Sequence, residues 1–318
     1  MYAKLKKMLM VGAVLISSPA LAQQYPNKPI TMIIPFSPGA SNDIFGRYLA
    51  DGLSKLWKQT VVVENRAGAG GSIGAVAVVK SRADGYTIMF SSSSYTINSA
   101  VQKPLPFDPI KDIKPVAMAM RGQMIAVTGN RIPLPNLAEV VKQAKSQKVF
   151  YGANGASSTT FAAELFANVA GVKLEGVNYK GGTESMVDMI GGRLDIYFGT
   201  VTTVLPSVLN KSVTAVAVTS LTRSPALPDV PTVAEAGFPG AETDIWWGVF
   251  VPAGTPADVM AKINEGVNTV VGTPEAKDFL EKQAALPARS TVDDFTKTVV
   301  TELAKWKELA EKHNITAD

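Results

Sequence analysis

The sequence contains no cysteine and only one histidine, His313, close to its C-terminal end. Without cysteine no disulfide can stabilise the chain, so the fold depends on its hydrophobic core. A Ser–His–Asp or Cys–His catalytic arrangement would have to use His313, and zinc or copper would lack their usual ligands. The sequence leaves open an enzyme that uses two carboxylates as its acid and its base. The scarcity of catalytic groups favours a binding protein over an enzyme.

Charge of either sign is also scarce. Charged residues make up 18% of the 318-residue chain, with 31 Lys and Arg against 27 Asp and Glu. Three of the lysines, Lys4, Lys6 and Lys7, lie in an N-terminal segment that we expect to be removed, and the remaining chain is then nearly neutral. It carries no basic field for a nucleic acid and no acidic field for a polycation.

The sequence has no apolar run long enough to span a bilayer. Residues 1–22 combine three lysines, a short apolar core and the small-residue pattern Ala20-Leu-Ala22, as in a secretory signal peptide. A membrane anchor is the alternative for this segment. We expect cleavage near Gln23 and a periplasmic mature protein, with no lipid anchor because no cysteine follows the segment.

Two domains are expected from the length of the chain, and apolar strands alternate with helical patterns along most of it. The leading unit is a strand over 30–34, a Pro/Gly turn over 35–40 and a helix that begins near Ser41. Pro-rich stretches over 101–115 and 221–239 are predicted as loops, and 116–120, 124–128 and 246–251 as extended segments. Three C-terminal helices are expected to begin at Thr255-Pro256, Thr273-Pro274 and Thr291 with Asp294.

Small and hydroxyl-bearing residues recur where predicted strands hand over to helices. A helix N-terminus presents unpaired N–H groups and the positive end of the helix dipole, which suits a carboxylate or phosphate. The junctions at 35–43, 152–160 and 177–183 have this form, with the helix of the second predicted over 161–169; serines also follow the strand over 86–90 and threonines the strand over 196–198. Mere helix capping is the alternative reading of each junction.

The glycine-rich segment 65–74 does not fit a dinucleotide-binding fingerprint, because Ile73 stands where the third glycine is required. We interpret it as a turn that lets the next helix pack closely. A carboxylate-only metal site needs clustered acids, and Asp43, Asp195 and Asp244 have no acidic neighbour nearby. We therefore expect no cofactor, no metal and no catalytic residue.

Several motifs resemble those of the tripartite tricarboxylate transporter receptors, also called the Bug family. They include Pro35-Phe-Ser-Pro-Gly39, Glu64-Asn-Arg66, Asp84-Gly-Tyr86, Gly191-Gly-x-Leu-Asp195 and the segment from Arg223 to Gly237. The resemblance covers essentially the whole mature chain. It implies an α/β, two-lobed periplasmic-binding-protein (Venus flytrap) fold, each lobe a mostly parallel sheet flanked by helices. The lobes are expected at 25–122 with 246–318, and at 123–245.

The resemblance further implies a monomeric receptor that closes on a small organic carboxylate and delivers it to the large and small membrane subunits of a transporter. In that family the loops matching Phe36–Asp43 and Gly152–Thr160 hold the ligand. Combined with the junctions above, this predicts the following ligand-binding residues: Phe36, Ser37, Gly39, Ala40, Ser41, Asn42, Asp43, Ser92, Ser93, Tyr95, Asn154, Gly155, Ser157, Ser158, Thr159, Gly181, Thr200 and Trp246.

Two departures from the family pattern bear on the ligand. Thr159 or Thr160 stands where the family often has histidine, and Gly199-Thr200 stands where an acidic or amide residue is common. These changes predict a roomier, less polar cleft for an aromatic or medium-chain dicarboxylate such as terephthalate, lined by Phe36, Tyr95 and Trp246 unless these aromatics belong to the core. A citrate-like tricarboxylate and an acidic amino acid are the alternatives.

Two other classes of protein stay open at this point. An enzyme on the same fold would use Asp43 or Asp195 as a base, although Asp43 is spaced to pair with Arg47 on one helix and Asp195 suits a structural role at a strand start. A secreted structural or adhesion module would have no cleft for a small molecule.

Overall fold

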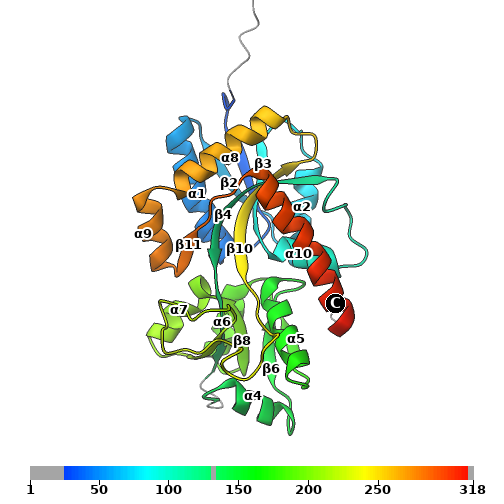
Figure 1. The fold of residues 1–318 in the computed structure, drawn as a ribbon, viewed down its shortest axis with the longest axis vertical. Helices are drawn as coiled ribbons and strands as arrows, with labels where there is room; N and C mark the ends of the chain where they lie inside the picture. Colours follow the sequence, from blue (N-terminus) through cyan, green and yellow to red (C-terminus); the bar gives the residue numbers. More distant parts are fainter. Residues whose placement is uncertain (1–24, 130–133, 314–318) are drawn as a thin grey trace, which may run out of the picture.

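The computed structural model describes residues 25–129 and 134–313. These residues form two lobes, each built on its own β-sheet and covered by helices on both faces (Figure 1). The predicted signal segment over 1–22 lies outside the described residues. No helix among them is long and apolar enough to cross a membrane.

The first lobe contains a six-stranded sheet in the order β11-β4-β10-β3-β1-β2. One face is covered by helices α1 and α8, whose Leu49 and Ile263 lie in the same core cluster, and the other face by α2 and α10, which contribute Val78 and Phe295. Its elements are β1 (Ile30–Ile34), α1 (Ser41–Trp57), β2 (Val61–Asn65), the short 3-10 helix η1 (Ala69–Gly71), α2 (Ser72–Val79), β3 (Thr87–Ser92), α3 (Ser94–Val101), β4 (Ile113–Gly122), β10 (Ile245–Pro252), α8 (Ala257–Val271), α9 (Pro274–Lys282), β11 (Ala285–Pro287) and α10 (Val292–His313).

The second lobe contains a five-stranded sheet in the order β7-β6-β8-β5-β9. Helices α4 and α5 pack on one face through Val140 and Phe166, and α6 and α7 pack on the other through Met189 and Val204. Its elements are β5 (Met124–Thr128), α4 (Leu137–Ala144), β6 (Phe150–Ala153), α5 (Ser158–Val169), β7 (Glu175–Asn178), α6 (Gly182–Ile190), β8 (Ile196–Thr200), α7 (Val201–Leu209) and β9 (Thr214–Val218).

Both sheets are mixed, which corrects the expectation of mostly parallel sheets. In the first sheet β1 pairs in parallel with β2 and β3, whereas β10 and β11 run antiparallel to their neighbours. In the second sheet β5 runs antiparallel to both β8 and β9. The reason is the route of the chain, because β5 and β10 are the strands by which it enters the second sheet and returns to the first.

The chain passes between the sheets twice. The first passage is direct, since only Gln123 separates β4 from β5, and the second runs from β9 to β10 through residues 219–244. The end of the second passage lies beside the first where the two lobes meet, because Ile245 pairs with Gly122 (Figure 1). The predicted lobe boundary at 122/123 falls at the first passage, and the one at 245/246 falls one residue into β10, just after the second passage. Both boundaries remain predictions.

Two helices were absent from the sequence interpretation, and a third begins earlier than expected. Helices α3 and α7 follow Ser93 and Thr200 directly, in segments where consecutive serines or β-branched residues give little helical signal. Their burial against neighbouring elements, through Ile97 in α3 and Val204 in α7, outweighs this weak propensity. Helix α5 begins at Ser158, so this residue lies in the first helical turn and not in an exit loop.

The predicted helix starts near the C-terminus are largely confirmed. Thr273 caps α9 by accepting a hydrogen bond from the N–H of Ala276, with Pro274 at the first helical position. Thr291 and Asp294 form a reciprocal capping box. Helix α8 differs, because it begins after Pro256 without a side-chain cap.

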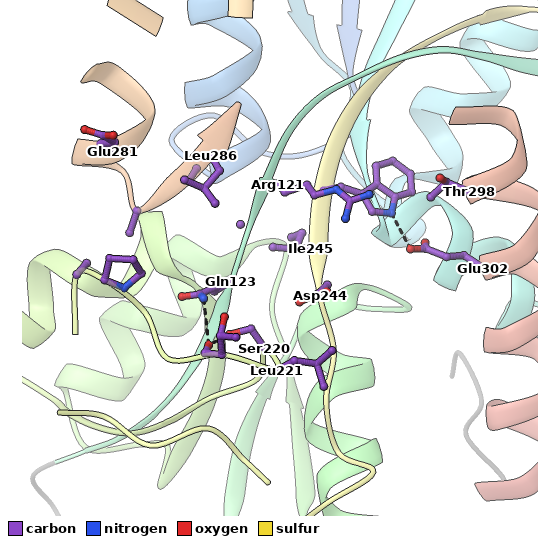
Figure 2. Close-up of a pocket in the computed structure, with 17 residues that line it drawn as sticks. Arg121, Gln123, Ser220, Leu221, Asp244, Ile245, Glu281, Leu286, Thr298 and Glu302 are labelled. Atoms are coloured by element: carbon purple, nitrogen blue, oxygen red, sulfur yellow. Dashed lines mark hydrogen bonds between the residues drawn. The ribbon is translucent and has the colours of Figure 1, made fainter. Parts of the chain in front are cut away.

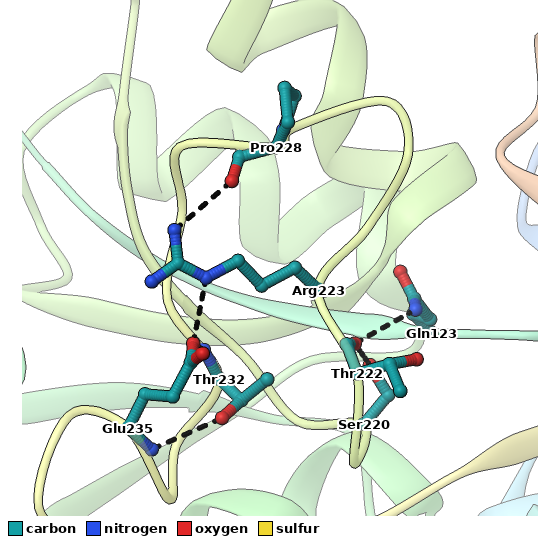
Figure 3. A network of polar contacts seen from close by, with 7 residues as sticks. All are labelled: Gln123, Ser220, Thr222, Arg223, Pro228, Thr232 and Glu235. Carbon is teal, nitrogen blue, oxygen red and sulfur yellow. Dashed lines mark hydrogen bonds and ion pairs between the residues drawn. The ribbon is translucent and has the colours of Figure 1, made fainter.

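The predicted loop over 221–239 is held together by a network around Glu235 (Figure 3). The Glu235 carboxylate accepts hydrogen bonds from Arg223 Nε at 2.8 Å and from the N–H of Thr232 at 2.8 Å. Arg223 also donates to the carbonyl of Pro228, and Thr232 Oγ1 accepts from the N–H of Glu235. This loop is therefore ordered by side-chain contacts although it contains no helix or strand of its own.

Strand β10 leaves no room for an added side-chain atom at Gly248. A Cβ there would lie 2.4 Å from the Phe295 ring and 2.7 Å from the Ala117 carbonyl oxygen. We expect Gly248→Ala to lower the free energy of unfolding by about 1–3 kcal/mol, because the backbone contact cannot relax by a rotamer change. Urea denaturation measures the loss. Val62→Ala on the exposed side of β2 is the control, expected within about 0.5 kcal/mol of wild type, and equal stability of all three proteins would contradict the packing described here.

Candidate functional site

A small cavity lies between the lobes, where five helix N-termini meet. Helices α1 and α3 approach it from the first lobe, and α5, α6 and α7 approach it from the second. Each of these helices follows the C-terminal end of a strand, which is where open α/β sheets place their ligands. The cavity measures about 50 Å³ in this arrangement of the lobes.

Most of the residues predicted to bind the ligand line this cavity. The first lobe contributes those of the β1–α1 turn and the end of β3, and the second lobe those at the starts of α5, α6 and α7. They are Phe36, Ala40, Ser41, Asn42, Ser92, Asn154, Ser157, Ser158, Thr159, Gly181 and Thr200.

Two of the three predicted aromatic residues lie elsewhere, which corrects their expected place. Tyr95 donates its hydroxyl proton to the carbonyl of Pro109 at 2.7 Å and packs its ring among core residues. Trp246 donates from Nε1 to Glu302 at 2.9 Å and lines a different cavity. Tyr95 and Trp246 are therefore core residues, which is the alternative that the sequence left open. Of the three predicted aromatic residues, only Phe36 lines the cavity between the lobes.

Five further predicted residues surround the cavity without lining it, namely Ser37, Gly39, Asp43, Ser93 and Gly155. Ser37 of the first lobe lies close to Gly181 of the second lobe. A Cβ added at Gly181 would be 3.4 Å from Ser37 Oγ. Gly155 lies similarly close to the N–H of Gly70. Gly39 and Gly155 have positive φ angles of 78° and 58°, so they shape the turns that precede the helices.

Five lining residues were missed, namely Ser94, Gly182, Tyr197, Thr203 and Ile245. Ser94, Gly182 and Thr203 lie in the first turns of helices α3, α6 and α7, next to residues that were predicted. Recognising the helices after Ser93 and Thr200 would have found Ser94 and Thr203. Tyr197 and Ile245 lie inside apolar strands and carry no local signal that separates them from core residues.

Serine hydroxyls join the two lobes directly at the cavity. Ser158 Oγ lies 3.0 Å from Ser93 Oγ and 3.0 Å from Ser94 Oγ, and the N–H of Ser158 donates to Ser94 Oγ at 3.1 Å. All three serines are buried. The structure thus has the lobes in contact, with the N-termini of α3 and α5 linked by hydrogen bonds.

A second set of hydrogen bonds holds the polar groups of the second lobe. Asn154 Oδ1 accepts from Thr159 Oγ1 at 3.0 Å and from the Tyr197 hydroxyl at 3.3 Å, while Asn154 Nδ2 donates to Ser185 Oγ. Burial raises the pKa of Tyr197 well above its usual range. The Tyr197 hydroxyl is therefore neutral and acts as a hydrogen-bond donor and acceptor, not as an acid.

Among the residues that the structure describes, no charged side chain lines the cavity. The positive potential there comes from the N-termini of helices of 8 to 17 residues and from their N–H groups. Asn42 adds a further polar group, because it is buried and its Oδ1 has no hydrogen-bond partner. A buried polar atom without a partner is costly, so Asn42 is suited to a ligand or a bridging water.

Asp43 does not line the cavity but holds the β1–α1 turn next to it. Its carboxylate accepts hydrogen bonds from Arg47 Nε at 2.9 Å, Asn65 Nδ2 at 2.8 Å and the N–H of Gly39 at 3.0 Å. Burial of the Asp43 carboxyl acts to raise its pKa, but these hydrogen bonds and the Arg47 charge outweigh burial and hold the pKa below its usual value. Asp43 therefore fixes the β1–α1 turn, as the expected Arg47 pair suggested.

Within residues 25–129 and 134–313, no group of three or more acidic or histidine side chains could hold a metal ion. Asp195, the other acid considered as a base, accepts a hydrogen bond from the N–H of Phe150 at 2.8 Å through Oδ2 and does not line the cavity. Its position beside β6 agrees with the structural role expected at a strand start.

Residues 45–315 match the family described as "Tripartite tricarboxylate transporter family receptor". The chain belongs to this receptor family. Among its relatives, Protein BugT of Bordetella pertussis is 33% identical over 296 residues, which cover 92% of this chain and 91% of BugT. The receptor has the two-lobed α/β fold of periplasmic binding proteins.

Solved structures agree with this assignment over nearly the whole receptor. An R. palustris protein solved with adipate has a TM-score of 0.88 and 30% identity, covering 92% of this chain and 99% of that one. MatC from Rhodopseudomonas palustris, solved with bound malate, has a TM-score of 0.86 and 25% identity, covering 90% and 99% of the two chains.

The Asp43 contacts make the stability of the receptor depend on pH. We expect Asp43→Asn to lower the free energy of unfolding by about 1–3 kcal/mol near neutral pH, because an amide cannot accept all three hydrogen bonds. The folded-state pKa of Asp43 lies below the ordinary value of 3.8. Its contribution is therefore complete above that value and is lost as the pH falls through the folded-state pKa.

Urea denaturation of the wild type and Asp43→Asn at about pH 7 and about pH 3 tests this expectation, with the difference shrinking at the lower pH. Asp51→Asn is the matched control, since Asp51 forms an exposed pair with Lys55 on the same helix. It should change stability by no more than about 0.5 kcal/mol. A difference between wild type and Asp43→Asn that is constant over this pH range would show that the carboxylate charge has no part.

Proposed function

We propose that this protein is a periplasmic receptor that captures a small organic carboxylate between its lobes and delivers it to the large and small membrane subunits of a tripartite tricarboxylate transporter. The supporting observation is the meeting of five helix N-termini at a cavity whose lining, over residues 25–129 and 134–313, includes no charged side chain. Backbone N–H groups, hydroxyls and the Asn42 amide can then bind a carboxylate without a cationic side chain.

Closure of the lobes explains how neutral groups suffice. A carboxylate touched by one helix N-terminus stays hydrated, whereas a carboxylate enclosed by both lobes loses water and experiences each dipole in a less polar medium. The lobes are in contact around the cavity, so we propose that they separate about the two passages to admit a dicarboxylate. The hydrogen bonds between Ser158 and Ser93 or Ser94 would break on opening.

The ligand that we favour is a medium-chain dicarboxylate such as adipate, the compound in one similar structure. Phe36, Tyr197 and Ile245 supply apolar surface beside the hydroxyls. Tyr95 and Trp246, the other aromatics that prompted the expectation of terephthalate, lie elsewhere. A short hydroxy-dicarboxylate is the second candidate, because malate is bound in MatC and Asn42 Oδ1 lacks a donor.

Catalysis is not part of the proposal. Asp43 and Asp195 each accept hydrogen bonds from backbone N–H groups, and neither lines the cavity. The lobes that we propose comprise residues 25–122 with 246–318, and residues 123–245. We further propose that the receptor acts as a monomer after removal of residues 1–22.

Binding of adipate should stabilise the receptor. At adipate concentrations a hundredfold above Kd, linkage predicts about 2.7 kcal/mol of added stability, which corresponds to roughly 5–10 °C in Tm for a chain of this size. A thermal-shift measurement with adipate, malate, citrate, terephthalate and aspartate tests this and ranks the ligand classes. Hexane-1,6-diol is the neutral control. If no acid in the panel raises Tm, the carboxylate proposal is wrong.

A negative charge placed in the cavity should abolish binding. Asn42→Asp puts a carboxylate beside the ligand where no cation can compensate it, so we expect the affinity for the acid that stabilises the wild type to fall at least about a hundredfold. Asn210→Asp is the matched control, because Asn210 is exposed at the end of α7. Calorimetry should find the control unchanged. Equal affinities of the two variants would remove Asn42 from the site.

A further inference from the structure

A second and larger cavity, which we call the hinge pocket, lies at the passages between the lobes (Figure 2). Its volume is about 530 Å³, within the range of sites for small molecules. The first lobe supplies Arg121, Trp246 and Leu286, and the second supplies Leu221 and other residues of the loop after β9. It shares only Ile245 with the cavity between the helix N-termini.

One wall of the hinge pocket is a row of three cross-strand neighbours. Arg121 on β4 pairs with Leu286 on β11 and with Trp246 on β10, so the three side chains lie on the same face of the sheet. Leu286 is 61% exposed and Leu221 on the other lobe is 78% exposed. Large apolar side chains are thus presented to the pocket from both lobes, where a ligand could cover them.

Two charged groups of the pocket have no ion pair in the described part of the chain. Arg121 donates from Nε to the sulfur of Met118, and no salt bridge within 4.0 Å joins its guanidinium to a carboxylate. Asp244 forms no salt bridge either, although the charges of Arg121 and Lys305 act on its carboxyl group. Gln123 Oε1 is a buried acceptor without a donor. A cation, an anion and an amide group thus lie among the residues that line this pocket.

The remaining acids of the pocket are already engaged. Glu302 accepts hydrogen bonds from Trp246 Nε1, Thr96 Oγ1 and Trp306 Nε1. Glu281 forms an exposed pair with Lys277. Asp244 and Gln123 are left as acceptors for an ammonium group, and Arg121 as the donor for a carboxylate.

We propose that the hinge pocket is a second binding site, for a zwitterion with an apolar body such as a free apolar amino acid. Asp244 and Gln123 Oε1 accept hydrogen bonds from its ammonium group and Arg121 binds its carboxylate. Leu221, Trp246 and Leu286 contact its side chain. The site differs from the cavity between the helix N-termini, which has only uncharged side chains in its described lining and binds an anion in the function proposed above.

Occupancy of the hinge pocket is coupled to the position of the lobes. Its walls come from both lobes, and the loop with Leu221 is held in shape by the Arg223–Glu235 network (Figure 3). A molecule that bridges these walls binds one lobe arrangement more tightly than others, so it also changes the affinity of the other cavity. This coupling rests on the carboxylate-binding function proposed above, whereas the site itself does not.

Calorimetry with L-phenylalanine as the probe tests the site directly. We expect a Kd below about 1 mM for the wild type. Phenethylamine lacks the carboxylate and 3-phenylpropionate lacks the ammonium group, so each should bind to this pocket at least about tenfold more weakly. Asp244→Asn and Arg121→Gln should each weaken L-phenylalanine at least about tenfold, and Asp258→Asn, on the exposed start of α8, should not.

Asn42→Asp separates the two cavities, because it alters only the cavity between the helix N-termini. L-phenylalanine binding that persists in Asn42→Asp, even with an affinity shifted by the coupling between the cavities, assigns the probe to the hinge pocket, and complete loss of binding overturns the proposal. It is also overturned if the wild type gives no heat at about 5 mM probe, or if binding survives both Asp244→Asn and Arg121→Gln. If neither adipate nor any other acid of the panel binds, the carboxylate proposal is wrong. The L-phenylalanine measurement still tests the hinge pocket as a binding site in that case.

Discussion

The packing of strand β10 is the constraint on which both lobes and both cavities depend. All eight of its residues are buried, and it pairs with β3 on one side and β4 on the other in the middle of the first sheet. It is also the return of the chain from the second lobe. Its first residue, Ile245, lines the small cavity and the hinge pocket alike. A change in the path of this strand would therefore alter the relative position of the lobes as well as the core.

This architecture gives the small cavity a positive potential without charged side chains in its described lining. Two sheets face each other across the passages, and the helices that follow their strands begin at the same small volume (Figure 1). Each helix contributes a partial positive charge and free N–H groups without the desolvation cost of a buried lysine or arginine. Charged pairs such as Asp43 with Arg47 lie beside the cavity and fix its turns.

The sequence interpretation succeeded where the chemistry is local. The strand–turn–helix unit at Ile30–Trp57, the capping residues Thr273 and Thr291, and most polar residues that line the cavity follow from motifs of a few residues. It failed where long-range packing decides. Helix α3 carries a serine-rich start and is stabilised by contacts with α10, some 200 residues away, and Tyr95 and Trp246 entered the core and not the cavity.

By itself the sequence determined the alternation of strands and helices, the lack of cysteine with only one histidine, and the family of the protein. These properties depend on residue type and spacing along the chain. Only the tertiary structure decided that both sheets are mixed, that Ser158 meets Ser93 and Ser94 across the lobes, and that a pocket opens beside Arg121 and Asp244. Those features join residues more than sixty positions apart, and no local pattern encodes such contacts.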